Sequence, residues 1–195
     1  WISIRASAPE IIAEARKVLS VAPEIELVQN NPAVEYLAYP NDTEFFSQWH
    51  LEKLEIPAAW DIEKGNRTII LAHLDTGANL NHVELSENIW VNQEELNGET
   101  GVDDDKNGYV DDINGWDFGD DDNDPSEEPN YPHGTATLGI IAASTNNASG
   151  IAGLLWETQV MIIKGTNKNS STSDPNPMAT LLDETASAII YAVDN

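Results

Sequence analysis

The sequence predicts an α/β fold with a mainly parallel sheet. Two continuous apolar segments, residues 69–74 and 158–163, have the composition of buried strands. Each is followed further along the chain by a segment with helical spacing, and this alternation is typical of a parallel sheet covered by helices. With 195 residues, the chain can form one ordinary domain with a small appendage.

Residues 1–39 are expected to form a separate, small unit of mixed α and β structure. Residues 1–6 alternate in the manner of a strand, whereas residues 9–19 carry their apolar side chains at helical spacing. Two short strands are expected at residues 25–28 and 34–37.

Residues 40–195 are expected to hold the main domain. Pro57 favours the start of a short helix, and the strand at 69–74 is expected to be covered on both faces. Residues 84–131 are rich in Asp, Asn, Gly and Pro, which predicts mostly loop. The remaining elements are a helix at 133–144, a strand at 158–163 and a helix at 181–193.

The composition excludes several classes of protein. The formal net charge of −25 would repel nucleic-acid phosphates. No run of 18 or more apolar residues suggests a membrane span. The absence of cysteine rules out thiol nucleophiles, thiolate zinc sites and disulfides within the sequence.

The negative charge is concentrated in one region. Seventeen of the 34 acidic residues lie between Glu84 and Glu128, where Lys106 is the only basic residue. A bound cation would compensate such a local excess, and a solvated acidic loop is the alternative.

Two polar residues occupy positions that suit catalysis. Asp75 ends the first apolar strand, and catalytic groups gather at the carboxyl ends of parallel strands. His133 begins a helix of small residues, where the helix dipole disfavours protonation of the imidazole. Taken singly, Asp75 also fits a turn-capping residue and His133 an ordinary residue at a helix start. Their order, Asp before His, is that of subtilisin-type hydrolases.

Several motifs together resemble the subtilisin-like serine endopeptidases, the subtilase (S8) family. They are Asp75-Thr76-Gly77, His82-Val83-Glu84-Leu85, His133-Gly134-Thr135, Gln48-Trp49-His50-Leu51, Asn146-Asn147 and Gly150-Ile151-Ala152-Gly153. The resemblance covers residues 40–195 and implies a truncated form of the three-layer subtilisin-like fold. It also implies an Asp-His-Ser triad in which His133 is the general base and Asp75 orients it.

The resemblance has further implications for the whole protein. No serine after His133 has the context of the nucleophile, so we expect that group beyond Asn195, in the rest of the domain or on a separate chain. This chain alone is then expected to be inactive. Residues 1–39 would be the C-terminal part of an inhibitory, folding-assisting propeptide. The partners would be a polypeptide substrate and this propeptide, and the location extracellular. The alternative is a degenerate, non-catalytic calcium-binding module that serves as a scaffold.

Calcium is the cofactor expected in the acidic region. Asp103, Asp105 and Asn107 fall at positions 1, 3 and 5 of a calcium loop, with Gly108 at position 6. Asp111 or Asp112 could complete the shell, because Asn114 replaces the usual glutamate at position 12. An acidic turn without metal is the alternative.

Two more calcium clusters are implied by the resemblance. The Trp-Asp-Phe segment and the acids after it would supply Asp117, Asp120, Asp122 and Asp124. A third site would join Asp42, Glu84 and Asn147. One departure from the family pattern is His73, at a strand position that is normally aliphatic. It is expected to be a core residue with its hydrogen bonds satisfied.

Overall fold

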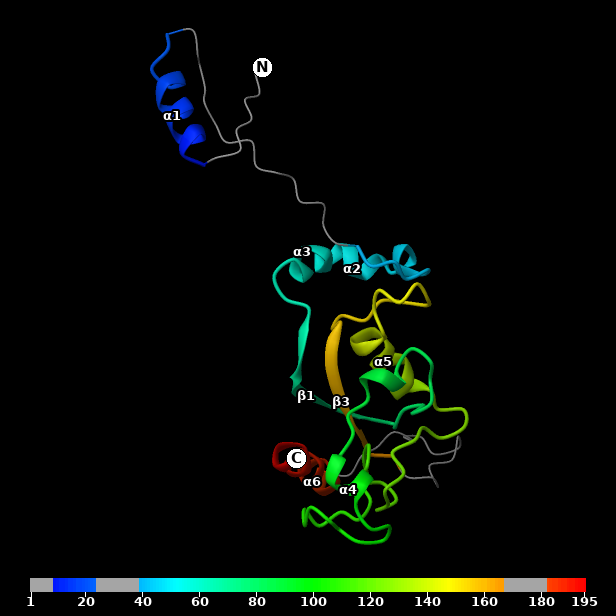
Figure 1. The fold of residues 1–195 in the computed structure, drawn as a ribbon. Helices are drawn as coiled ribbons and strands as arrows, with labels where there is room; N and C mark the ends of the chain where they lie inside the picture. Colours follow the sequence, from blue (N-terminus) through cyan, green and yellow to red (C-terminus); the bar gives the residue numbers. More distant parts are fainter. Residues whose placement is uncertain (1–8, 24–38, 167–181) are drawn as a thin grey trace. The chain divides into compact units, whose positions relative to one another are not determined.

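The computed structural model describes residues 9–23, 39–166 and 182–195 (Figure 1). The chain divides into two compact units, Trp1–Tyr36 and Leu37–Asn195. In the first unit, the predicted helix is present as α1, Pro9–Leu19. The strands expected at 1–6, 25–28 and 34–37 lie outside the described residues.

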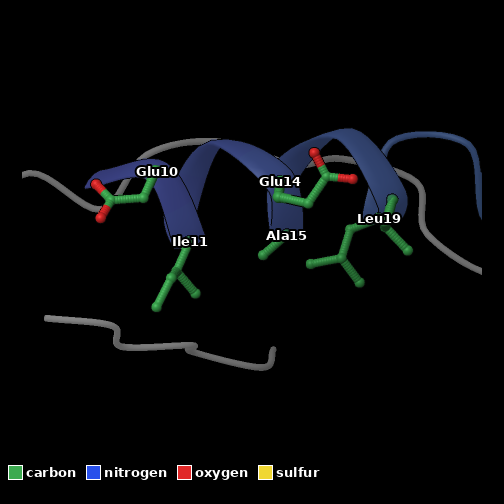
Figure 2. A pocket seen from close by; sticks show the side chains of 6 residues that line it. Glu10, Ile11, Glu14, Ala15 and Leu19 are labelled. Carbon is green, nitrogen blue, oxygen red and sulfur yellow. The ribbon is translucent and has the colours of Figure 1, made fainter. Parts of the chain in front are cut away.

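Residues on the apolar face of helix α1 line an open hollow (Figure 2). Its volume is about 520 Å³. Glu10 near the start of α1 and Lys17 near the end of α1 both suit the helix dipole. The hollow is formed by Glu10, Ile11, Glu14, Ala15, Val18 and Leu19. No residue that the structure describes covers this face, so we assign it no ligand.

The second unit is built on a parallel sheet with the strand order β1-β3-β2. Its strands are β1, Gly65–Asp75, β2, Gly115–Asp117, and β3, Glu157–Lys164. Asp75, Lys164 and Asp117 lie in register at the carboxyl ends of the three strands. The sheet therefore ends in one row of three charged residues.

Helices cover both faces of β3, as the fold class predicts. Val160 and Ile162 pack with Leu138 of α5, His133–Ala142, in one hydrophobic cluster. Met161 and Ile163 pack with Tyr191 of α6, Leu182–Asp194, in another. Because successive strand residues point to opposite faces, α5 and α6 lie on opposite sides of the sheet. The three-layer α/β arrangement is confirmed.

Short helices complete the second unit. Before the sheet come η1, Phe45–Ser47, α2, Trp49–Lys53, and α3, Ile56–Trp60. The region expected to be mostly loop holds η2, Ser86–Asn88, α4, Gln93–Asn97, and strand β2. These elements have three to five residues, too few to show a periodic apolar pattern.

Coverage of β1 on both faces was expected, and this expectation is wrong for the described residues. Ile69 is 67% exposed, and Leu74 is 38% exposed. Within the part of the chain that the structure describes, β1 pairs only with β3 and lies at the edge of the sheet. The apolar sequence of β1 is typical of an inner strand, although no described segment covers the outer edge of β1.

Helix α5 approaches the end of β1 very closely at Gly134. A Cβ atom on Gly134 would collide with the backbone carbonyl oxygen of Gly77 and would lie 3.3 Å from the Cβ of Asp75. Glycine therefore permits the close contact that sets His133 beside Asp75.

Replacing Gly134 by alanine should lower the free energy of unfolding by about 2 kcal/mol or more, because the collision is with rigid backbone. Gly139 in the same helix is a matched control, since its added Cβ would make an ordinary 3.6 Å contact with Ile151. Gly139→Ala should be neutral or slightly stabilising through helix propensity. Urea unfolding of the two variants measures the difference, and equal stabilities would contradict the close-packing argument.

Candidate active site

The carboxylate of Asp75 lies at the end of β1 and is surrounded by hydrogen-bond donors. Its Oδ1 accepts from the Thr76 backbone N–H at 2.7 Å, and its Oδ2 accepts from the Thr137 hydroxyl at 3.1 Å. Burial acts to raise the pKa of Asp75, but hydrogen bonds from His133, Thr76 and Thr137 outweigh burial and lower the pKa. Asp75 is therefore held as a carboxylate.

His133 begins α5 and faces the same carboxylate. Its Nδ1 lies 2.7 Å from Asp75 Oδ1, and its side chain is 56% exposed. The backbone N–H of Gly134 donates to the Thr76 hydroxyl at 3.0 Å, which ties the start of the helix to the strand end. With Nδ1–H bonded to Asp75, Nε2 is the ring atom that can accept a proton.

A second histidine lies on the other side of Asp75. His73 is 7% exposed, and its Nε2 lies 3.1 Å from the Thr137 hydroxyl oxygen and 3.9 Å from Asp75 Oδ2. The expectation of a satisfied core residue is only half correct, because His73 Nδ1 is buried without a hydrogen-bond partner among the described residues.

The next charged residue in the row at the sheet end is Lys164, which is fully buried. Its ammonium lies 2.9 Å from Asp117 Oδ2 and 2.8 Å from Glu128 Oε1. Burial acts to lower the pKa of Lys164, but hydrogen bonds to Asp117 and Glu128 outweigh burial and raise the pKa. Lys164 was missed in the sequence, where its one signal is a cation at the end of an apolar strand.

The first acidic loop is organised by Glu95, which is 3% exposed and was also missed in the sequence. Its carboxylate accepts from the backbone N–H groups of Asp104, Asp105 and Asp111. Carboxylate oxygens of Glu95, Asp103 and Asp105 lie within 4.8 Å of one another, close enough to bind one ion together. The only sequence signal for Glu95 is its place on α4, ten residues before Asp105.

The other predicted residues of this loop have defined partners. Asn107 Nδ2 donates to carboxylate oxygens of Asp105 and Asp112, which are close to 3 Å away. Asp112 is fully buried and also accepts from the Tyr191 hydroxyl at 2.6 Å. Asp111 Oδ2 accepts from the Gly101 backbone N–H. The predicted loop is thus brought together around Asp105 and Asn107.

The second predicted cluster contains one residue that already has a cationic neighbour. Asp117 pairs with Lys164, while Asp122 and Asp124 each accept a backbone N–H two residues further on. Asp120 donates its backbone N–H to Asp117 Oδ1 at 3.2 Å. The role of these four residues as calcium ligands stays a prediction.

In the third predicted cluster Glu84 contacts Asn147 directly, while Asp42 contacts the neighbouring Asn146. Asp42 Oδ2 accepts from the Asn146 backbone N–H at 2.8 Å, and Glu84 Oε2 accepts from the Asn147 side chain at 3.2 Å. Asp42 Oδ1 is buried without a hydrogen-bond partner among the described residues. A buried carboxylate oxygen of this kind fits an oxygen-binding cation.

Lys164→Met should lower the free energy of unfolding by about 3–5 kcal/mol, because Asp117 would remain buried without its counter-charge. The double variant Lys164→Met with Asp117→Leu should recover much of that loss. Lys53→Met, at an exposed position of α2, is the control. Calorimetric melting of the three proteins tests this, and a single variant as stable as the control would refute the buried pair.

Comparisons with known proteins agree with this architecture. The Subtilase family profile, peptidase S8, matches residues 66–184. The chain is 32% identical over 189 residues to the thermophilic serine proteinase of Bacillus sp. strain AK1, which is 92% of this chain and 39% of that protein. It is 39% identical over 124 residues to subtilisin-like protease 1 of Plasmodium vivax, which is 63% of this chain and 19% of that protein.

Two further similarities concern location and fold. The halolysin-like extracellular serine protease of Natrialba magadii is 31% identical over 137 residues, 67% of this chain and 21% of that protein. A solved protease structure from Pseudoalteromonas arctica superposes with a TM-score of 0.57 at 25% identity, covering 80% of this chain and 44% of that one.

The chain thus spans less than half the length of these relatives. In the part that the structure describes, no helix has the length and apolar character needed to cross a bilayer. The profile match covers more than half of the chain and includes both Asp75 and His133. The chain belongs to the subtilase family of serine peptidases.

Proposed function

We propose that this chain is the N-terminal portion of a serine endopeptidase and contributes the Asp and His of its catalytic triad. The single observation that carries the proposal is the 2.7 Å contact between His133 Nδ1 and Asp75 Oδ1 at the carboxyl end of β1. The family supports peptide hydrolysis in general, and the residue roles are our inference.

In the proposed reaction His133 is the general base. Its Nε2 takes the proton from a serine hydroxyl as that oxygen attacks the peptide carbonyl carbon, and later gives the proton to the leaving amine. Asp75 holds the imidazole through Nδ1–H and stabilises the imidazolium that forms. Water then releases the acyl group by the same two proton transfers in reverse order.

The nucleophile of this reaction is not among the described serines after His133. Ser144 and Ser149 lie in the segment that follows α5 and precedes β3, and Ser187 lies inside α6. None of the three has the glycine-flanked turn from strand to helix that exposes a nucleophilic hydroxyl. We propose that the serine, the oxyanion-hole donor and the main substrate-binding strand lie beyond Asn195.

On this proposal the chain by itself should neither hydrolyse a chromogenic peptide nor react with a fluorophosphonate, because the serine that both reagents require would lie beyond Asn195. The assay is run beside an active subtilase and beside the same chain after heat denaturation. Turnover or labelling by the native chain above the heated sample would overturn the assignment of the nucleophile.

Calcium is the proposed cofactor, and the donor chemistry of the acidic loops suits it. Carboxylate and amide oxygens are the ligands that calcium prefers. The grouping of Glu95, Asp103 and Asp105 supports one site. The buried Oδ1 of Asp42, which has no hydrogen-bond partner in the described part of the chain, supports another near Glu84 and Asn147. The cluster of Asp120, Asp122 and Asp124 is a third proposed site, with Asp117 compensated by Lys164.

Calcium should raise the melting temperature of this chain, because ligands that bind only the folded state stabilise it by ~2.7 kcal/mol at about 100 times Kd. Asp103→Asn should reduce the rise, since Asp103 belongs to the proposed cluster. Glu52→Gln, at an exposed position of α2, should leave it unchanged. Equal melting temperatures in millimolar calcium and in chelator would refute the metal sites.

We further propose that residues 1–39 belong to a propeptide, that residues 40–195 belong to the catalytic domain, and that the protein is secreted. The alternative is a non-catalytic calcium-binding module. Adding the remaining part of the domain distinguishes the two. Restored hydrolysis that His133→Ala abolishes would support the peptidase, while calcium binding without hydrolysis would support the module.

A further inference from the structure

Two imidazoles share one carboxylate at the end of β1. His73 and Asp75 are two residues apart on the strand and so point to the same face. His133 and Thr137 are four residues apart on α5 and so lie on one face of the helix. His133 contacts Oδ1 of Asp75, while the Thr137 hydroxyl connects Oδ2 to His73.

The hydroxyl of Thr137 has one hydrogen, and this fixes the direction of the hydrogen bonds. Its oxygen lies 3.1 Å from Asp75 Oδ2, from the His133 carbonyl and from the Gly134 carbonyl. The ionised carboxylate is the strongest of these acceptors, so the hydroxyl donates to Asp75. The Thr137 oxygen must then accept from His73, which requires the proton of His73 to be on Nε2.

The surroundings of His73 keep its ring neutral. Its Nδ1 has no acceptor among the described residues, so a proton there would be buried without a hydrogen bond. The charged or titratable groups that act on His73 are Asp75 on its own strand and His133 on α5, and its register partner on β3 is the apolar Ile162. Burial, with repulsion from His133, lowers the pKa of His73 and outweighs attraction to Asp75.

We propose that His73 is a positioning residue of the Asp75–His133 pair, and that it acts as a neutral donor through Thr137. The chain of hydrogen bonds runs from His73 Nε2–H to the Thr137 oxygen and from the Thr137 hydroxyl to Asp75 Oδ2. It holds Oδ2 in place, leaves Oδ1 for His133, and keeps Asp75 ionised. A charged His73 would compete with His133 for the carboxylate, and its burial prevents this.

This proposal rests on the proposed role of His133, but its test measures protonation and not hydrolysis. A failure of the role proposed for His73 can therefore be distinguished from a failure of the catalytic role proposed for His133. The experiment is an NMR titration of the present chain with ¹⁵N-labelled histidine and ¹³C-labelled aspartate. The ring nitrogens report the tautomer of His73, and the carboxyl carbon reports the pKa of Asp75.

The wild-type chain should show a pKa of His73 below that of an ordinary histidine, because its ring is buried, and the neutral ring should carry its proton on Nε2. His73→Val should raise the pKa of Asp75 by roughly half a unit, about threefold in proton affinity, since a donor to the charged form is lost. Thr137→Val should raise it by at least as much, because it removes the direct hydrogen bond. His73→Gln keeps an N–H donor and should restore most of the wild-type pKa.

Leu71→Val is the matched control, because Leu71 lies on the same face of β1 and packs on the core without contacting Asp75. It should leave the pKa of Asp75 unchanged. The proposal is overturned if His73 carries its proton on Nδ1, if His73→Val behaves like the control, or if His73→Gln shifts the pKa as far as His73→Val. Should His73→Val not fold, the wild-type tautomer and the Thr137→Val and His73→Gln variants decide.

Discussion

The acidic half of this molecule depends on the ion pairs that the buried ammonium of Lys164 makes. Lys164 sits between Asp75 and Asp117 in register across the sheet end and also pairs with Glu128, five residues before His133. Without a cation there, the carboxylates at the sheet end would repel one another in a medium that screens charge poorly. One lysine therefore fixes the carboxyl end of the sheet and the segment that leads into the candidate catalytic helix. At this point a lysine side chain neutralises the carboxylates, and an ion from solution is not needed to do so.

The acidic region also shows how carboxylates can act as structural acceptors. Glu95 takes three backbone N–H groups of the loop, and Asp112 is surrounded by the side chains of Asn92, Asn107 and Tyr191. Such carboxylates replace the water that the backbone of the loop would otherwise bind. These hydrogen bonds hold the shape of the loop without help from an ion. An ion that binds the remaining oxygens then meets a preformed cage, which reduces the entropy lost on binding. Negative charge here serves both to build the loop and to attract its proposed ligand.

Sequence reasoning could predict the fold and the candidate pair because both follow from local signals. Asp75 ends an apolar strand, His133 opens a small-residue helix, and the layers follow from strand and helix alternation. Glu95, Lys164 and Thr137 were missed for a common reason. Each acts through partners nine or more residues away in the sequence, and a single sequence holds no sign of which distant groups meet. Elements as short as β2 and α4 were missed because three to five residues carry too little periodic signal.

The exposed edge of β1 has a consequence for how this polypeptide behaves in solution. Among the described residues no strand pairs with the outer side of β1, so its backbone groups there, flanked by Ile69, Ile70 and Leu74, can pair with another strand. Native proteins blunt such edges with lysines or bulges. Residues 69–74 of β1 contain no lysine, and the irregularity in the pairing of β1 with β3 lies between Gly65 and Ile70. What opposes self-association is long-range repulsion between chains that each carry a net charge of −25. Salt screens that repulsion, so colloidal stability of the chain depends on ionic strength even though its hydrophobic clusters do not.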